Sequence, residues 1–218
     1  MAEIYMSQIK LLEDERNAKE ALDGIDGLRK EELKNVSAPK KRAQMITAGL
    51  LVQHGAREHL GDQAPDGIYA VARTEKGKPY FTELPDVHFS ISHSGNMALV
   101  AVSDVNVGAD IQEWRELNAD IAGRFFHPAE KEHLKHLTPS ESEKAFFNIW
   151  CLKESYAKYA GGDLLQALEE LDFTPVLEGG FAVFEFTENN DRIRAEILEA
   201  PHGYSAAVIE KLVIEEEK

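Results

Sequence analysis

Cysteine and long apolar runs are scarce in this chain of 218 residues. It contains a single cysteine, Cys151, and no apolar run approaches the roughly 20 residues that a membrane-spanning helix needs. One cysteine cannot form an intramolecular disulfide, which is typical of proteins in reducing compartments. The N-terminus also lacks the basic-then-apolar order of a signal peptide. We therefore expect a cytoplasmic protein without a membrane partner. Cys151 is expected to be a packing residue on a helix.

Basic residues are also scarce, with 24 Lys and Arg against 39 Asp and Glu, and the formal net charge is −15. Nucleic acids and anionic membranes require a positive surface, so we expect no nucleic-acid partner. The charge is uneven, however. Residues 29–42 contain six basic and two acidic residues, a local charge of +4. This segment is either a binding region for a small polyanion or a solvated helix end and loop.

Apolar residues make up 43% of the chain, which is enough for a sizeable core, and their spacing alternates between strand and helix periods. Strands are expected at Glu3–Leu12, His88–His93, Met97–Val102, Val107–Gln112, Phe181–Phe186, Arg192–Glu199 and Tyr204–Ile214. Helices are expected within Glu13–Lys34, broken near Gly24 and Gly27, and at Lys40–Leu60 and Pro139–Ala160. We predict an α+β fold, a pseudo-dimer of two similar subdomains, 1–103 and 104–218, each an antiparallel sheet with a prominent packed helix.

The expected helix at Pro139–Ala160 has clear start and stop signals. Thr138 and Glu141 form a capping-box pattern around Pro139, and Gly161 follows the last helical residue. These signals predict a helix of about 20 residues, long enough to be a central scaffold.

A lysine interrupts the apolar face of this helix. Because the helical period is 3.6 residues, Lys153 falls on the same face as Phe146 and Trp150, with Glu154 and Lys158 at its margin. One interpretation is a lysine that extends to solvent beside an ordinary Glu154–Lys158 surface pair. The other is that these charges belong to a functional site.

A second charge interrupts a strand. Side chains alternate along a strand, so Asp110 and Gln112 lie on one face of Val107–Gln112. Aspartate is a poor strand former, and its presence in mid-strand indicates either an edge strand or a site.

Four segments, joined by Arg124–Glu130, form a recognisable series: Gly77-Lys-Pro, Phe89–Ser94, Val107–Gln112, and Trp150–Ser155 with Lys158. In this order and spacing the chain resembles the 4′-phosphopantetheinyl transferases of the long, Sfp-like type, from about Lys40 to Gly162. The resemblance implies a site between two similar halves. There, coenzyme A would donate its phosphopantetheine arm to a serine of an apo acyl carrier or peptidyl carrier protein, releasing 3′,5′-ADP.

The resemblance also implies a Mg²⁺ ion held by Asp110 and Glu154 against the pyrophosphate. Glu154, directly or through a water, would be the base for the incoming serine, and Lys158 and His93 would neutralise the pyrophosphate as catalytic residues. The third metal position carries Gln112 where Asp-x-Glu is usual in the family. A neutral carboxamide binds Mg²⁺ less strongly, so we expect a water in that place or a weaker metal site.

Six residues would bind coenzyme A by the same resemblance: Arg42, Lys41, Lys78, Ser92, His93 and Lys158. Of these, His93 and Lys158 would lie at the pyrophosphate, and Lys78, Ser92 and Arg42 at the nucleotide end with its 3′-phosphate. We expect a monomer. Two alternatives stay open: a non-catalytic relative that binds coenzyme A or a carrier protein, and a metal-dependent phosphohydrolase that uses the same carboxylates.

Overall fold

The structure is a computed structural model that describes residues 1–9, 15–115, 119–161, 169–186 and 191–213. The chain divides into two compact units, Met1–Val107 (unit 1) and Gly108–Lys218 (unit 2). The boundary expected from the sequence, between residues 103 and 104, lies slightly earlier in the chain. No helix in the described residues is long and apolar enough to cross a bilayer.

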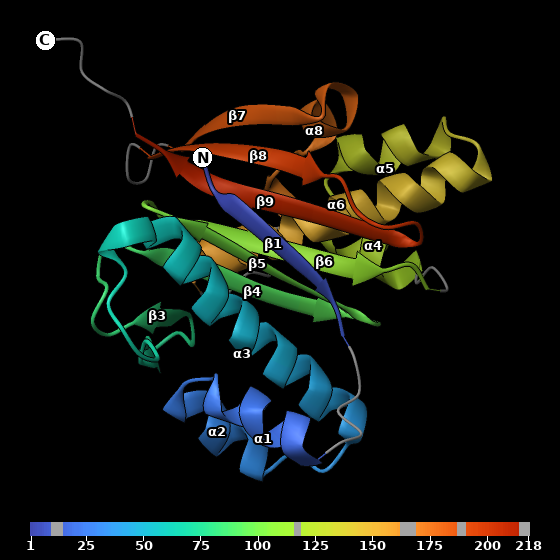
Figure 1. Cartoon of the computed structure of the whole chain (residues 1–218). Coiled ribbons are helices and arrows are strands. Elements are labelled where there is room, and N and C mark those ends of the chain that lie inside the picture. The colour runs from blue at the N-terminus through green and yellow to red at the C-terminus, as the bar shows by residue number, and fades with distance from the viewer. Residues whose placement is uncertain (10–14, 116–118, 162–168, 187–190, 214–218) are drawn as a thin grey trace, which may run out of the picture. The chain divides into compact units, whose positions relative to one another are not determined.

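Unit 1 is built on a three-stranded antiparallel sheet with the order β1-β5-β4, formed by β1 (Glu3–Gln8), β5 (Met97–Ser103) and β4 (His88–Ser94). The central strand β5 is almost wholly buried, which explains its continuous apolar run. Helix α3 (Pro39–Leu60) packs against this sheet (Figure 1). Gly95 has a positive φ of 54° at the turn between β4 and β5, where a glycine is favoured.

Two short helices cover the side of α3 that faces away from the sheet: α1 (Glu15–Asp23) and α2 (Gly27–Lys34) (Figure 1). Their apolar contacts with α3 centre on Ile25, Leu33 and Ile46. After α3 come a 3₁₀ turn, Gly61–Gln63, and a small hairpin of β2 (Val71–Arg73) and β3 (Pro79–Phe81). The predicted helix break near Gly24 and Gly27 is confirmed.

Unit 2 contains a four-stranded sheet with the order β6-β9-β8-β7. Its strands are β6 (Val107–Glu113), β7 (Phe181–Phe186), β8 (Asp191–Leu198) and β9 (Tyr204–Leu212). The last three form the antiparallel meander that alternation along the sequence predicts. Strand β6 lies at the edge beside β9, so the edge position that Asp110 suggested is also confirmed.

Helix α6 (Pro139–Ala160) packs on this sheet, chiefly against β9, through Leu152, Ile193 and Ile209. The expected start is confirmed, since Glu141 accepts a hydrogen bond from the Thr138 backbone N–H at 3.0 Å. Gly161 ends the helix in the left-handed conformation, with a φ of 70°. Cys151 is fully buried, as expected, and its thiol donates to the Ser205 carbonyl of β9.

Unit 2 also contains the shorter helices α4 (Ala119–Phe125), α5 (Pro128–Lys135) and α8 (Thr174–Gly179). The α8 helix was not expected. Strand β1 ends at Gln8; Ile9 lies outside it, and the expected end of the strand, from residue 10 to Leu12, lies outside the described residues. Each unit thus pairs an antiparallel sheet with one helix of 22 residues, which confirms the predicted α+β class.

Candidate functional site

Backbone contact between strand β6 and helix α6 sets the geometry of a charged cluster in unit 2, formed by Asp110, Glu154 and Lys158. A Cβ atom added to Gly108 would lie 2.1 Å from the Ser155 carbonyl oxygen and 2.4 Å from the Tyr159 backbone nitrogen. No side chain fits there, so β6 can lie directly against the helix backbone only with glycine at this position. The Ser155 hydroxyl donates to the Ala207 carbonyl at 3.0 Å, which holds α6 on β9 as well.

This close approach brings Asp110 of β6 to Lys158 of α6. The Lys158 Nζ lies 2.6 Å from Asp110 Oδ1, and it also donates to the Ala109 carbonyl at 3.2 Å. Asp110 is buried, with 5% of its surface exposed, so its ion pair is largely shielded from solvent. Lys158 therefore joins the helix to the strand, and the simple surface-pair interpretation is wrong.

Glu154 is half-buried one turn before Lys158 on the same helix. Burial raises the pKa of its carboxyl, and the negative charge of Asp110 raises that pKa further, against the opposing effect of Lys158. The carboxylates of Asp110 and Glu154 thus influence each other, and the Lys158 ammonium offsets part of that repulsion. A divalent cation with oxygen ligands suits this arrangement.

Gln112 is half-buried on the same face of β6 as Asp110, two residues further along the strand. Its amide nitrogen lies 3.4 Å from the Glu113 carbonyl, a long hydrogen bond. Within the described ranges, no three His, Cys, Asp or Glu side chains are grouped as a metal site. A Mg²⁺ ion beside Asp110 and Glu154 would take its remaining ligands from water and substrate phosphate, as is usual for this ion.

Lys153, the residue that interrupts the apolar face of α6, does not extend to solvent. It is fully buried and lies 3.0 Å from Glu130 Oε2 of α5, which is also fully buried. Its ammonium donates to the Leu171 carbonyl at 2.9 Å and lies 5.4 Å from the centre of the Phe173 ring. The interpretation as a snorkelling lysine is wrong. Sequence reasoning missed Glu130 as its partner, although a lysine in an apolar stripe was the signal that one existed.

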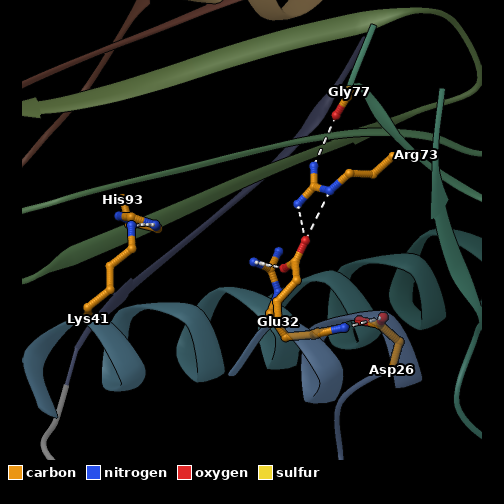
Figure 2. Close-up of polar contacts among 7 residues, drawn as sticks. Asp26, Glu32, Lys41, Arg73, Gly77 and His93 are labelled. Carbon is orange, nitrogen blue, oxygen red and sulfur yellow. Dashed lines mark hydrogen bonds and ion pairs between the residues drawn. The ribbon is translucent and has the colours of Figure 1, made fainter. Parts of the chain in front are cut away.

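In unit 1, two predicted phosphate-binding residues lie side by side. Lys41, in the first turn of α3, places its Nζ 3.4 Å from His93 Nε2 on β4 (Figure 2). The Gln44 amide donates to the Gly95 carbonyl at 3.1 Å and so holds the start of α3 on the β4–β5 turn. Ser92 precedes His93 and is buried in β4.

Lys78 follows the glycine turn of the β2–β3 hairpin. Its ammonium donates to the Asn106 side chain and, at 3.1 Å, to the Val107 carbonyl. Burial lowers the pKa of this ammonium to about 8. The contacts hold the amine near the start of β6.

Arg42 has a structural contact that the sequence did not predict. Its Nη1 donates to the Leu33 carbonyl at 2.6 Å, in the last turn of α2, and to the Val36 carbonyl at 3.1 Å, just after the helix. These bonds hold the C-terminal end of α2 against the first turn of α3. The structure therefore brings Lys41 and His93 together, while Arg42 lies against α2 and Lys78 at the hairpin.

Comparisons with known proteins give a consistent family. Residues 106–209 match the 4′-phosphopantetheinyl transferase superfamily. A 4′-phosphopantetheinyl transferase of Bacillus subtilis is 34% identical over 163 residues, which cover 75% of this chain and 71% of that protein. The 4′-phosphopantetheinyl transferase Sfp of Bacillus subtilis (strain 168) is 31% identical over 134 residues, covering 62% of this chain and 59% of that protein.

Among solved structures, a holo-(acyl-carrier-protein) synthase from Bacillus anthracis str. Ames in complex with CoA (3′,5′-ADP) is similar to part of the chain. The likeness covers 49% of this chain and 95% of that chain, with a TM-score of 0.36 and 16% sequence identity.

Proposed function

Since the chain belongs to the 4′-phosphopantetheinyl transferase superfamily, we propose that it transfers the phosphopantetheine arm of coenzyme A to a serine hydroxyl of an apo carrier protein. The other product is 3′,5′-ADP. The transferase class agrees with the prediction from sequence. The observation that carries the proposed chemistry is the cluster of Asp110, Glu154 and Lys158 where β6 touches α6.

Asp110 and Glu154 are the residues that would hold Mg²⁺, with Gln112 acting through a water. Bound there, the ion would neutralise charge on the pyrophosphate while the phosphoryl group moves. Glu154 accepts the proton of the serine hydroxyl, directly or through a water. Its raised pKa makes it a stronger base than an ordinary exposed carboxylate. Lys158 keeps Asp110 in place and presents a positive charge to the pyrophosphate.

The basic residues of unit 1 are proposed to bind coenzyme A. His93 and its neighbour Lys41 would contact phosphate oxygens, which favour two adjacent nitrogen donors. Lys78 and Ser92 would bind the nucleotide end. Arg42 would contribute its guanidinium nitrogens other than Nη1, which already bonds two carbonyl groups. The partner would be an acyl carrier or peptidyl carrier protein, and the enzyme would act as a cytoplasmic monomer.

The test is incubation with coenzyme A, Mg²⁺ and an apo carrier protein, followed by mass spectrometry of the carrier. Wild-type protein should add the mass of one phosphopantetheine arm. Glu154→Gln should nearly abolish the transfer while leaving the thermal midpoint unchanged. Glu143→Gln is the matched control, since Glu143 lies on the same helix about three turns from Glu154. It should keep wild-type activity.

Three results would overturn parts of the proposal. Activity of Glu154→Gln within a few-fold of wild type would remove Glu154 from the base and metal roles. Coenzyme A binding without a mass gain on several carriers would favour a non-catalytic binding protein. Breakdown of coenzyme A in the absence of a carrier would favour a phosphohydrolase.

A further inference from the structure

A series of polar contacts in unit 1 connects helix α2 with the turn that carries Lys78. The Arg73 guanidinium, at the end of β2, donates from Nε and Nη2 to Glu32 Oε1 at 3.0 and 2.8 Å. Its third nitrogen, Nη1, donates to the Gly77 carbonyl at 3.0 Å. Figure 2 shows Arg73 between Glu32 on the helix and Gly77 in the turn. One side chain therefore ties the turn to the helix.

The helix end of this series is itself held in place. Glu32 Oε2 accepts a hydrogen bond from Arg29 Nη1 at 3.2 Å, and the backbone N–H of Arg29 donates to Asp26, the N-cap of α2. The Glu32 side chain is 27% exposed, so its ion pairs are partly shielded from solvent. Several fixed donors around one carboxylate limit its movement, which makes Glu32 an anchor rather than an ordinary surface charge.

The turn end leads directly to Lys78. Gly77 has a φ of 86°, which only glycine adopts readily, and its N–H donates to the Thr74 carbonyl at 2.8 Å. The Lys78 backbone N–H donates to the Thr74 hydroxyl at 3.1 Å, and the Lys78 carbonyl accepts from the Thr74 N–H at 2.9 Å. The position of the Lys78 backbone thus depends on the turn that Arg73 holds.

We propose that Glu32 and Arg73 are positioning residues for coenzyme A binding, because they fix the turn from which Lys78 reaches the nucleotide end. The inference rests on the proposed function. It gives α2 a role in substrate affinity that acts through the turn of Lys78. Glu32, one of the two acidic residues in the basic segment 29–42, thus orients Lys78 through Arg73.

The experiment measures the dissociation constants of coenzyme A and of dephospho-coenzyme A, which lacks the 3′-phosphate, by calorimetry. Glu32→Gln should raise the constant for coenzyme A about fivefold, the loss expected for one partly shielded ion pair. The constant for dephospho-coenzyme A should stay unchanged. KM for coenzyme A should rise by the same factor while kcat stays within twofold of wild type.

Two further variants make the test specific. Glu31→Gln is the matched control, because Glu31 pairs with Lys34 on the same helix at 2.5 Å with both side chains about two-thirds exposed. It should bind both ligands like wild type. The double variant Glu32→Gln/Lys78→Ala should bind coenzyme A no more weakly than Lys78→Ala alone, since Glu32 acts through Lys78.

The outcomes distinguish a failure of the proposed function from a failure of the positioning role of Glu32 and Arg73. Absence of coenzyme A binding by wild-type protein would overturn the proposed function together with this inference. If wild type and Lys78→Ala differ but Glu32→Gln binds like wild type, the inference alone is overturned. It is also overturned if Glu32→Gln weakens both ligands equally, or if its effect adds fully to that of Lys78→Ala.

Discussion

The buried ion pair between Lys153 and Glu130 predicts a large and specific loss of stability when one partner is removed. In Glu130→Gln the Lys153 ammonium stays fully buried without a carboxylate at 3.0 Å. Breaking such a pair from one side costs about 3–5 kcal/mol, because an uncompensated charge is left in the interior. With a urea dependence of about 2 kcal/mol per molar, the unfolding midpoint should fall by about 2 M.

Removing both charges should restore most of the stability. Burial is the largest effect on both partners: it raises the pKa of Glu130 and lowers the pKa of Lys153. Desolvation therefore offsets much of the attraction between them. Glutamine at position 130 can still accept a hydrogen bond from the Phe173 or His127 backbone N–H, which now donate to Glu130 at 2.9 and 2.8 Å. Glu130→Gln/Lys153→Met should thus be more stable than either single variant.

Tryptophan fluorescence in urea is the appropriate assay. The two tryptophans, Trp114 and Trp150, both lie in unit 2, so their emission follows the unfolding of the unit that contains the pair. Glu132→Gln is the matched control: on the same helix, Glu132 pairs with Lys135 at 2.8 Å, but both side chains are exposed. Its midpoint should not change.

Two results would refute this reasoning. One is a Glu130→Gln midpoint equal to that of the Glu132→Gln control, which would mean that the buried charge needs no partner. The other is a double variant no more stable than the more stable of the two single variants, which would assign the loss to packing rather than to an unpaired charge.

Two other predictions concern the β6–α6 cluster. Gly108→Ala should lower the unfolding midpoint of unit 2 and reduce transfer activity, because the new Cβ would displace β6 and with it Asp110. The control is Gly123→Ala, because a Cβ added there meets nothing within 4 Å. A Gly108→Ala midpoint equal to the control would contradict the close contact. Gln112→Glu should lower the Mg²⁺ concentration needed for half-maximal activity, since a carboxylate binds this ion more strongly than a carboxamide. Identical metal titration curves for the variant and the wild type would count against a role for Gln112.

Features that depend on neighbouring residues could be predicted from the sequence. The ends of α6 follow from the capping box at Thr138 and from Gly161, both of which act within one helical turn. The β4–β5 hairpin and the final meander follow from alternation and turn residues. The family resemblance also rests on such local segments, and the charged residues that it singled out at positions 110, 154 and 158 are brought together in unit 2.

What the sequence alone could not determine are the partners of its charged side chains. Lys158 pairs with Asp110 on a strand, and Lys153 pairs with Glu130 on another helix. Spacing along the chain says which face of a helix a charge occupies, but the choice of partner depends on which element packs against that face. In unit 2 that packing depends on Gly108, because only the absence of a side chain there lets β6 and α6 meet backbone to backbone.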